Sequence, residues 1–122
     1  MTRILYVDDE ADIREVAQMS LELDPAFEVR TCASGAEGIA EASAWRPDLI
    51  LLDVMMPGMD GPTTFTRLQE QSETAAIPVV FITARTQAQD VASFHALGAR
   101  GVIAKPFDPM TLTAQVRDLL NG

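Results

Sequence analysis

The sequence has 122 residues, 48% of them hydrophobic, and a formal net charge of −9 from 18 acidic and 9 basic residues. This length suits one domain, 1–122, with a single core, and the apolar fraction is too high for a disordered chain. The acidic balance argues against direct binding to nucleic acid, which needs a basic face. The lone Cys32 excludes an internal disulfide. No apolar run suits a signal peptide or a membrane span, so we expect a cytoplasmic protein without a membrane partner.

Five short apolar runs alternate with five amphipathic stretches along the chain. The runs predict strands over residues 4–7, 27–32, 49–53, 78–83 and 101–104. The second run alternates apolar and polar residues, which is typical of a strand near the sheet edge. The first, third and fourth runs are continuously apolar, as in strands buried on both faces. The alternation of strands with helices predicts an α/β fold with a parallel sheet covered on both sides.

The stretches between the strands predict five helices, whose buried faces follow the 3.6-residue period. The expected inward residues are Ile13, Val16, Ala17, Ser20 and Leu21 in the first helix; Ala36, Ile39, Ala40 and Ala44 in the second; Phe65 and Leu68 in the third; Val91, Phe94 and Leu97 in the fourth; and Leu112, Val116 and Leu119 in the fifth. Gly61 and Pro62 should open the third helix, Gly98 should end the fourth, and Asp108 should cap the fifth.

Polar side chains follow four of the five runs. Asp8 and Asp9 come after the first, Asp53 ends the third, Thr83 the fourth, and Lys105 follows the fifth. Because the carboxyl ends of parallel strands meet at one edge of the sheet, these residues should converge there. Three neighbouring carboxylates repel unless a cation joins them, and Mg²⁺ prefers such oxygen ligands. Carboxylate, Mg²⁺, ammonium and hydroxyl together suit phosphoryl transfer, with an aspartate as nucleophile giving an acyl phosphate.

The same residues resemble a known family, the receiver domains of bacterial two-component response regulators. The matching motifs are Asp8-Asp9, Asp53 with the following stretch 54–61, Thr83-Ala84, and Lys105-Pro106-Phe107, and the likeness covers the whole chain. Within this family, the sequence resembles the single-domain receivers that are similar to the chemotaxis regulators. The resemblance implies a doubly wound, flavodoxin-like sheet of five parallel strands in the order 2-1-3-4-5.

The resemblance also implies a function in a phosphorelay. Asp53 would receive a phosphoryl group from a sensor histidine kinase or a phosphotransfer protein, and the domain would then bind an unidentified downstream protein. That partner would meet the face formed by the fourth helix, fifth strand and fifth helix. The chain would not be an enzyme beyond phosphorylating, and slowly dephosphorylating, its own aspartate. The implied site residues are Asp8, Asp9, Asp53 and the Met55 carbonyl for Mg²⁺, with Asp53, Lys105, Thr83 and the Ala84 backbone for the phosphoryl group.

One position departs from the family pattern, and three other functions compete. Val102 stands where receivers often carry the Tyr or Phe that partners the threonine during signalling. A dehalogenase-like phosphatase would need a second carboxylate two residues after Asp53, where Met55 stands. A flavin-binding flavodoxin would need a Ser-, Thr- and Gly-rich loop after the first strand instead of residues 8–10. A binding module independent of phosphate remains open, because Val102 favours it although all the site residues are present.

Overall fold

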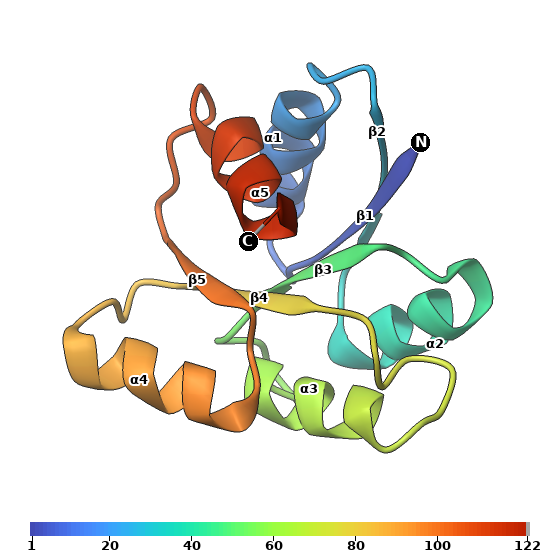
Figure 1. Ribbon diagram of the computed structural model, residues 1–122, viewed down its shortest axis with the longest axis vertical. Coiled ribbons are helices and arrows are strands. Elements are labelled where there is room, and N and C mark those ends of the chain that lie inside the picture. The colour runs from blue at the N-terminus through green and yellow to red at the C-terminus, as the bar shows by residue number, and fades with distance from the viewer. Residues whose placement is uncertain (122) are drawn as a thin grey trace.

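The computed structural model describes residues 1–121, which form five strands and five helices in strict alternation (Figure 1). The strands are β1 (Thr2–Val7), β2 (Phe27–Cys32), β3 (Leu49–Asp53), β4 (Val79–Thr83) and β5 (Gly101–Ala104). The helices are α1 (Ala11–Leu21), α2 (Gly35–Trp45), α3 (Gly61–Gln69), α4 (Ala88–Leu97) and α5 (Leu112–Asn121). The elements expected from the sequence are all present, with β1 beginning two residues earlier and β4 one residue later than predicted.

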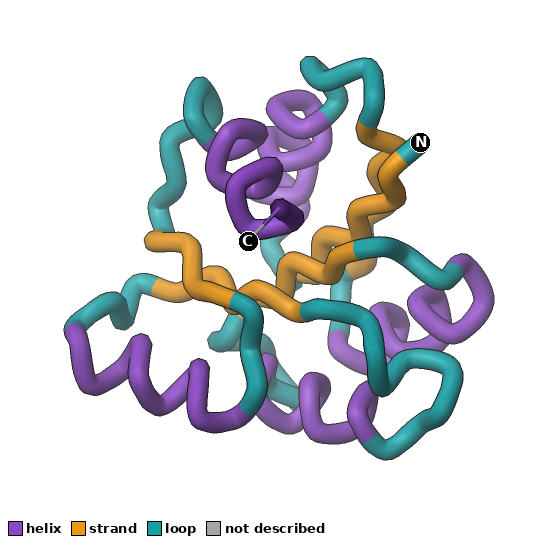
Figure 2. Tube along the Cα trace, viewed as in Figure 1, coloured by secondary structure: helices purple, strands orange, loops and turns teal. Residues whose placement is uncertain are grey.

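All strands pair in parallel, in the order β2-β1-β3-β4-β5, so the predicted doubly wound sheet is confirmed (Figure 2). The alternating strand β2 lies at the edge, as its pattern indicated. Strands β1, β3 and β4 lie inside the sheet, which explains why their sequences are apolar on both faces.

Helices α1 and α5 cover one face of the sheet, and α2, α3 and α4 cover the other (Figure 1). Successive residues of β1 therefore enter different cores. Ile4 and Tyr6 pack with Leu21 and Leu112 on the face of α1 and α5, whereas Val7 packs with Phe65 on the opposite face. No helix of the described residues is long and apolar enough to cross a membrane.

The predicted inward face of α2 is right for one residue and wrong for three. Ile39 is half-buried and packs against the core, whereas Ala36, Ala40 and Ala44 are exposed. The buried residues are instead Gly35, Gly38, Ala42 and Trp45. A Cβ atom at Gly38 would come within 3.0 Å of Val7, and one at Gly35 would overlap the Thr64 hydroxyl. The helix approaches the sheet and α3 so closely that glycines lie on its inner face. Hydrophobic periodicity does not detect such a face, because glycine has no apolar side chain.

Two smaller predictions also need correction. Val16 in α1 is 39% exposed and does not belong to the core, whereas Ala17 and Leu21 are fully buried. The Asp108 side chain accepts a hydrogen bond from the Met110 amide at 2.8 Å, so it caps the turn that leads into α5, whereas the amide of Leu112, the first residue of the helix, donates to the Asp108 carbonyl at 3.0 Å. The turn signal at Gly98 is confirmed, since this residue ends α4 with a φ of 113°.

Candidate functional site

The polar residues singled out from the sequence lie at the carboxyl edge of the sheet. Asp53 and Thr83 are the last residues of β3 and β4, while Asp8 and Lys105 directly follow β1 and β5. Backbone hydrogen bonds continue past the strand ends: Asp8 N donates to Cys32 O at 3.1 Å, and Lys105 N donates to Thr83 O at 2.9 Å. The sheet therefore fixes the backbone from which these side chains project.

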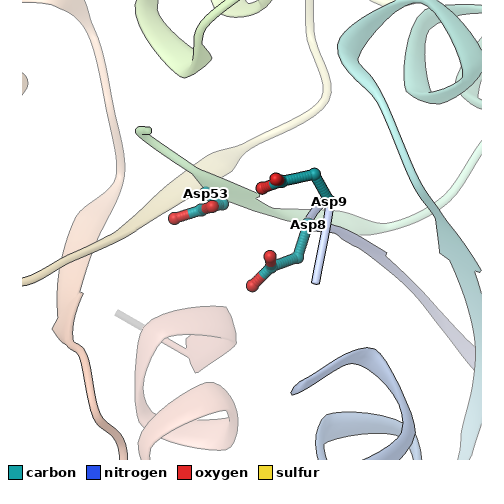
Figure 3. A group of neighbouring side chains, drawn as sticks. All are labelled: Asp8, Asp9 and Asp53. Carbon is teal, nitrogen blue, oxygen red and sulfur yellow. The ribbon is translucent and has the colours of Figure 1, made fainter. Parts of the chain in front are cut away.

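Three carboxylates meet at this edge, as Figure 3 shows. Asp8, Asp9 and Asp53 each offer an oxygen, and these oxygens lie within 4.8 Å of one another. Asp8 and Asp53 are buried, at 0% and 3% exposure, and Asp9 is exposed. Buried like charges at such separations are costly without a cation.

Lys105 supplies one positive charge to the cluster. Its Nζ lies 3.1 Å from Asp8 Oδ2, 3.4 Å from Asp53 Oδ1 and 3.9 Å from Glu10 Oε1. Burial lowers the pKa of Lys105, but the hydrogen bond to Asp8 and the charges of Asp53 and Asp8 outweigh it, and the net pKa is raised. The ammonium group therefore stays charged while it is shared between two buried carboxylates.

Asp53 is the least satisfied member of the cluster. Its Oδ2 is buried and has no hydrogen-bond partner among the described residues. Burial, followed by the charge of Asp8, raises the pKa of Asp53 from 3.8 to about 6, although Lys105 opposes the shift. A buried oxygen that lacks a partner is ready to accept a cation or an electrophile.

The loop after β3 holds Asp53 in place through a close approach of its backbone. Gly61 N donates to Val54 O at 2.9 Å, which brings the start of α3 onto the end of β3. A Cβ atom at Gly61 would lie 2.5 Å from the carbonyl oxygen of Asp53, so a glycine is required there. Asp60 caps α3 by accepting a hydrogen bond from Thr63 N.

Thr83, Ala84 and Met55 lie around the same edge. The Thr83 side chain is buried, and its hydroxyl accepts a hydrogen bond from the Arg85 amide at 3.0 Å. Ala84 and Met55 are exposed, with Met55 at 72%. A methionine side chain has no oxygen, so the backbone carbonyl is the only oxygen that Met55 can offer to a cation.

Sequence reasoning missed three residues that surround Asp8. The Tyr6 hydroxyl donates to Asp8 Oδ2 at 3.0 Å, Glu10 N donates to Asp8 Oδ1 at 3.0 Å, and Arg14 donates to the Asp8 carbonyl at 2.8 Å. A signal for Tyr6 exists, because residues two apart on a strand face the same way. A tyrosine two residues before a buried aspartate can therefore reach it.

The donor set fits a hard divalent cation such as Mg²⁺. It consists of carboxylate oxygens, which Mg²⁺ prefers over nitrogen or sulfur, and it includes Asp53, which has a buried oxygen without a hydrogen-bond partner among the described residues. Asp8, Asp9 and Asp53 could hold such an ion.

Comparison with known proteins places this chain in a family. The model of the response regulator receiver domain matches residues 4–117. The transcriptional regulatory protein CseB of Streptomyces coelicolor is 39% identical over 119 residues, which are 98% of this chain and 49% of that protein. The response regulator PleD of Caulobacter vibrioides is 44% identical over 119 residues, 96% of this chain and 26% of that protein. The chain thus spans about half of the first relative and about a quarter of the second.

The solved structures agree with the sequence comparison. The chemotaxis response regulator CheY4 of Vibrio cholerae superposes with a TM-score of 0.89 at 34% identity, over 98% of both chains. A response regulator receiver domain protein of Methanospirillum hungatei, described as CheY-like, gives a TM-score of 0.85 at 25% identity, over 99% of this chain and 94% of that one. With the family model covering nearly its whole length, the chain belongs to the receiver domains of two-component response regulators, which are phosphoacceptor signalling modules.

Proposed function

We propose that Asp53 is the phosphoacceptor of this receiver domain. The observation that carries the proposal is the contrast between its two oxygens. Oδ1 faces Lys105 at 3.4 Å, whereas Oδ2 is buried without a hydrogen-bond partner among the described residues. Asp8, by comparison, has hydrogen-bond donors on both oxygens. Asp53 therefore has the free lone pair that a nucleophile needs.

The reaction is a transfer from nitrogen to oxygen. A carboxylate oxygen of Asp53 forms a bond to phosphorus as the bond between phosphorus and the donor histidine nitrogen breaks. The electron pair of the broken bond stays on the imidazole, which takes up a proton, and Asp53 becomes an acyl phosphate. Attack by water on phosphorus returns the carboxylate and inorganic phosphate. Both steps depend chiefly on positioning and on neutralising charge.

The remaining side chains supply that positioning. Mg²⁺, when bound, neutralises charge on the phosphoryl oxygens. Asp8, Asp9 and Asp53, with the Met55 carbonyl, would hold it. Lys105 leaves its place between the carboxylates to bind a phosphoryl oxygen, and the Thr83 hydroxyl and Ala84 backbone bind the others. The support for the role of Lys105 is its position, 3.1 Å from Asp8 and 3.4 Å from Asp53.

The donor is a sensor histidine kinase or a phosphotransfer protein. Such donors draw the phosphoryl group from ATP, so the reaction belongs in the cytoplasm. Membership of the receiver family suggests that the output face consists of α4, β5 and α5. The weak anchoring of α4 supports this proposal, since Phe94 is its one buried residue and Leu97 is 46% exposed. Val102 of β5 is half-buried and packs against the same core as Phe94, in place of the usual aromatic residue.

Incubation with Mg²⁺ and acetyl phosphate, followed by intact-mass measurement, tests the proposal. The wild type should gain one phosphoryl group only when Mg²⁺ is present, and Asp53→Asn should gain none. Asp118→Asn is a matched control, since it removes an exposed carboxylate from α5 with the same change in mass. This variant should be phosphorylated like the wild type.

Two results would contradict the proposal. A phosphoryl group on Asp53→Asn would place the acceptor elsewhere. No phosphoryl group on the wild type, either from acetyl phosphate or from a phosphohistidine donor protein, would favour the phosphate-independent binding module. If the wild type is phosphorylated by the phosphohistidine donor protein but not by acetyl phosphate, the proposed role of Asp53 still holds.

A further inference from the structure

Tyr6 is a buried residue of β1 whose polar end reaches the functional site. Its side chain is completely buried, its ring packs edge-on against Phe107 with centroids 6.4 Å apart, and its hydroxyl donates to Asp8 Oδ2 at 3.0 Å. Tyr6 and Asp8 are two residues apart, so both side chains lie on the sheet face covered by α1 and α5. The ring fixes the hydroxyl beneath the carboxylate.

The hydroxyl shares its acceptor with Lys105. Asp8 Oδ1 accepts a hydrogen bond from Glu10 N at 3.0 Å, and Oδ2 accepts from both Tyr6 and Lys105 Nζ, the latter at 3.1 Å. Asp8 is 0% exposed, so water cannot replace a donor that leaves. Loss of the only partner of a buried carboxylate oxygen costs the full desolvation of that atom.

Phosphorylation would remove one of the two donors. When Lys105 turns to a phosphoryl oxygen on Asp53, Asp8 Oδ2 loses its ammonium partner and keeps the tyrosine hydroxyl. We propose that Tyr6 is a positioning residue that keeps Asp8 hydrogen-bonded and in place after Lys105 has moved to the phosphoryl group. This inference rests on the proposed roles of Asp53 and Lys105. Burial, and then the charge of Asp8, raises the pKa of Tyr6 above its ordinary value, so the hydroxyl remains a neutral donor.

The test uses Tyr6→Phe, which removes the hydroxyl and keeps the ring on Phe107. Beryllium fluoride, a stable analogue of the phosphoryl group, is titrated into the protein with Mg²⁺, and Mg²⁺ alone is titrated separately. We expect the affinity for beryllium fluoride to fall about tenfold, the size of a buried hydrogen bond to a charged acceptor. The affinity for Mg²⁺ alone should change less than about threefold, because Lys105 still occupies Asp8 Oδ2 in that state.

Two comparisons separate positioning from general damage to the fold. Thr74→Val removes another buried hydroxyl, which donates to Leu68 O at 2.6 Å in the connection between α3 and β4. It should lower the free energy of unfolding and leave the affinity for beryllium fluoride unchanged. In a Lys105→Ala background no ammonium leaves Asp8, so adding Tyr6→Phe should change the affinity less than about twofold.

Each other outcome identifies what has failed. If the wild type binds no beryllium fluoride, the proposed function is wrong, and the role of Tyr6 falls with it. If the wild type binds it and Tyr6→Phe binds it equally well, the inference alone is wrong. A tenfold loss that appears equally for Mg²⁺ alone, or that persists without Lys105, also overturns the inference, because the hydroxyl would then act before Lys105 moves.

Discussion

Replacing Asp53 by asparagine should make the domain more stable at neutral pH when no divalent cation is present. The wild-type carboxylate is buried, lies beside Asp8 and has an oxygen without a partner, so ionising it opposes folding. Asparagine has nearly the same shape and carries no charge. Lys105 keeps its contact with Asp8 at 3.1 Å in the variant, so removal of the Asp53 charge does not leave the ammonium group unpaired.

The pKa of Asp53 sets the magnitude and the pH window. It rises from 3.8 to about 6 on folding, a difference of about 2.2 units. At about 1.4 kcal/mol per unit, the ionised form costs at most about 3 kcal/mol. Between these two pH values the folded protein binds more protons at Asp53 than the unfolded chain, so this residue's contribution to the free energy of unfolding falls as pH rises. Below pH 4 the cost is absent, and above pH 6 it is complete.

Urea denaturation of both proteins between pH 4 and pH 8, in a chelator, measures the difference directly. The free energy of unfolding of Asp53→Asn should exceed that of the wild type by about 2–3 kcal/mol at pH 7.5 and by less than about 0.5 kcal/mol at pH 4. Adding Mg²⁺ should then stabilise the wild type preferentially, because a ligand that binds only the folded state favours it. Equal stabilities at pH 7.5, or a difference that does not vary with pH, would refute the electrostatic reasoning.

Two further substitutions test the surroundings of Asp53. Lys105→Met removes the cation shared by Asp8 and Asp53, so the free energy of unfolding at pH 7.5 should fall by about 3 kcal/mol. It should recover partly when Mg²⁺ is added. A loss of stability that Mg²⁺ does not change would contradict the role of Lys105 as the shared cation. Gly61→Ala places a methyl group 2.5 Å from the Asp53 carbonyl oxygen and should lower the free energy of unfolding, measured by urea denaturation, by about 2 kcal/mol. Gly58→Ala, where nothing lies within 4 Å, is its control and should cost about 1 kcal/mol through its φ of 76° alone.

The convergence of the site could be predicted because it follows from topology. Each of the strands β1, β3, β4 and β5 reads as an apolar run that stops at a polar residue, and a parallel sheet brings those stops together. Strand order and strand direction alone place these residues at one edge. This explains why Asp8 and Asp53, which are 45 positions apart in the printed sequence, could be assigned to one cluster.

The inner face of α2 and the donors around Asp8 could not be predicted by the same reasoning. Hydrophobic periodicity scores what a side chain contributes, whereas Gly35 and Gly38 are buried because they have no side chain to separate the helix from Thr64 and Val7. In the sequence, Tyr6 is one more residue of an apolar strand. Its ring does fill the core, but its hydroxyl acts on Asp8, and an apolar run cannot reveal that second role.

The position of Val102 limits how a signal can leave this site. It lies opposite Phe81 in the pairing of β4 with β5 and packs in the core that also holds Phe94 of α4. A β-branched residue is stiff at χ1 and has no ring to swing between exposed and buried positions. We therefore expect movement of Thr83 to act on α4 through the exposed connection 84–87 and through the packing of Phe94 on Phe81, whose ring centroids are 4.9 Å apart. Rotation of a side chain on β5 should not be needed.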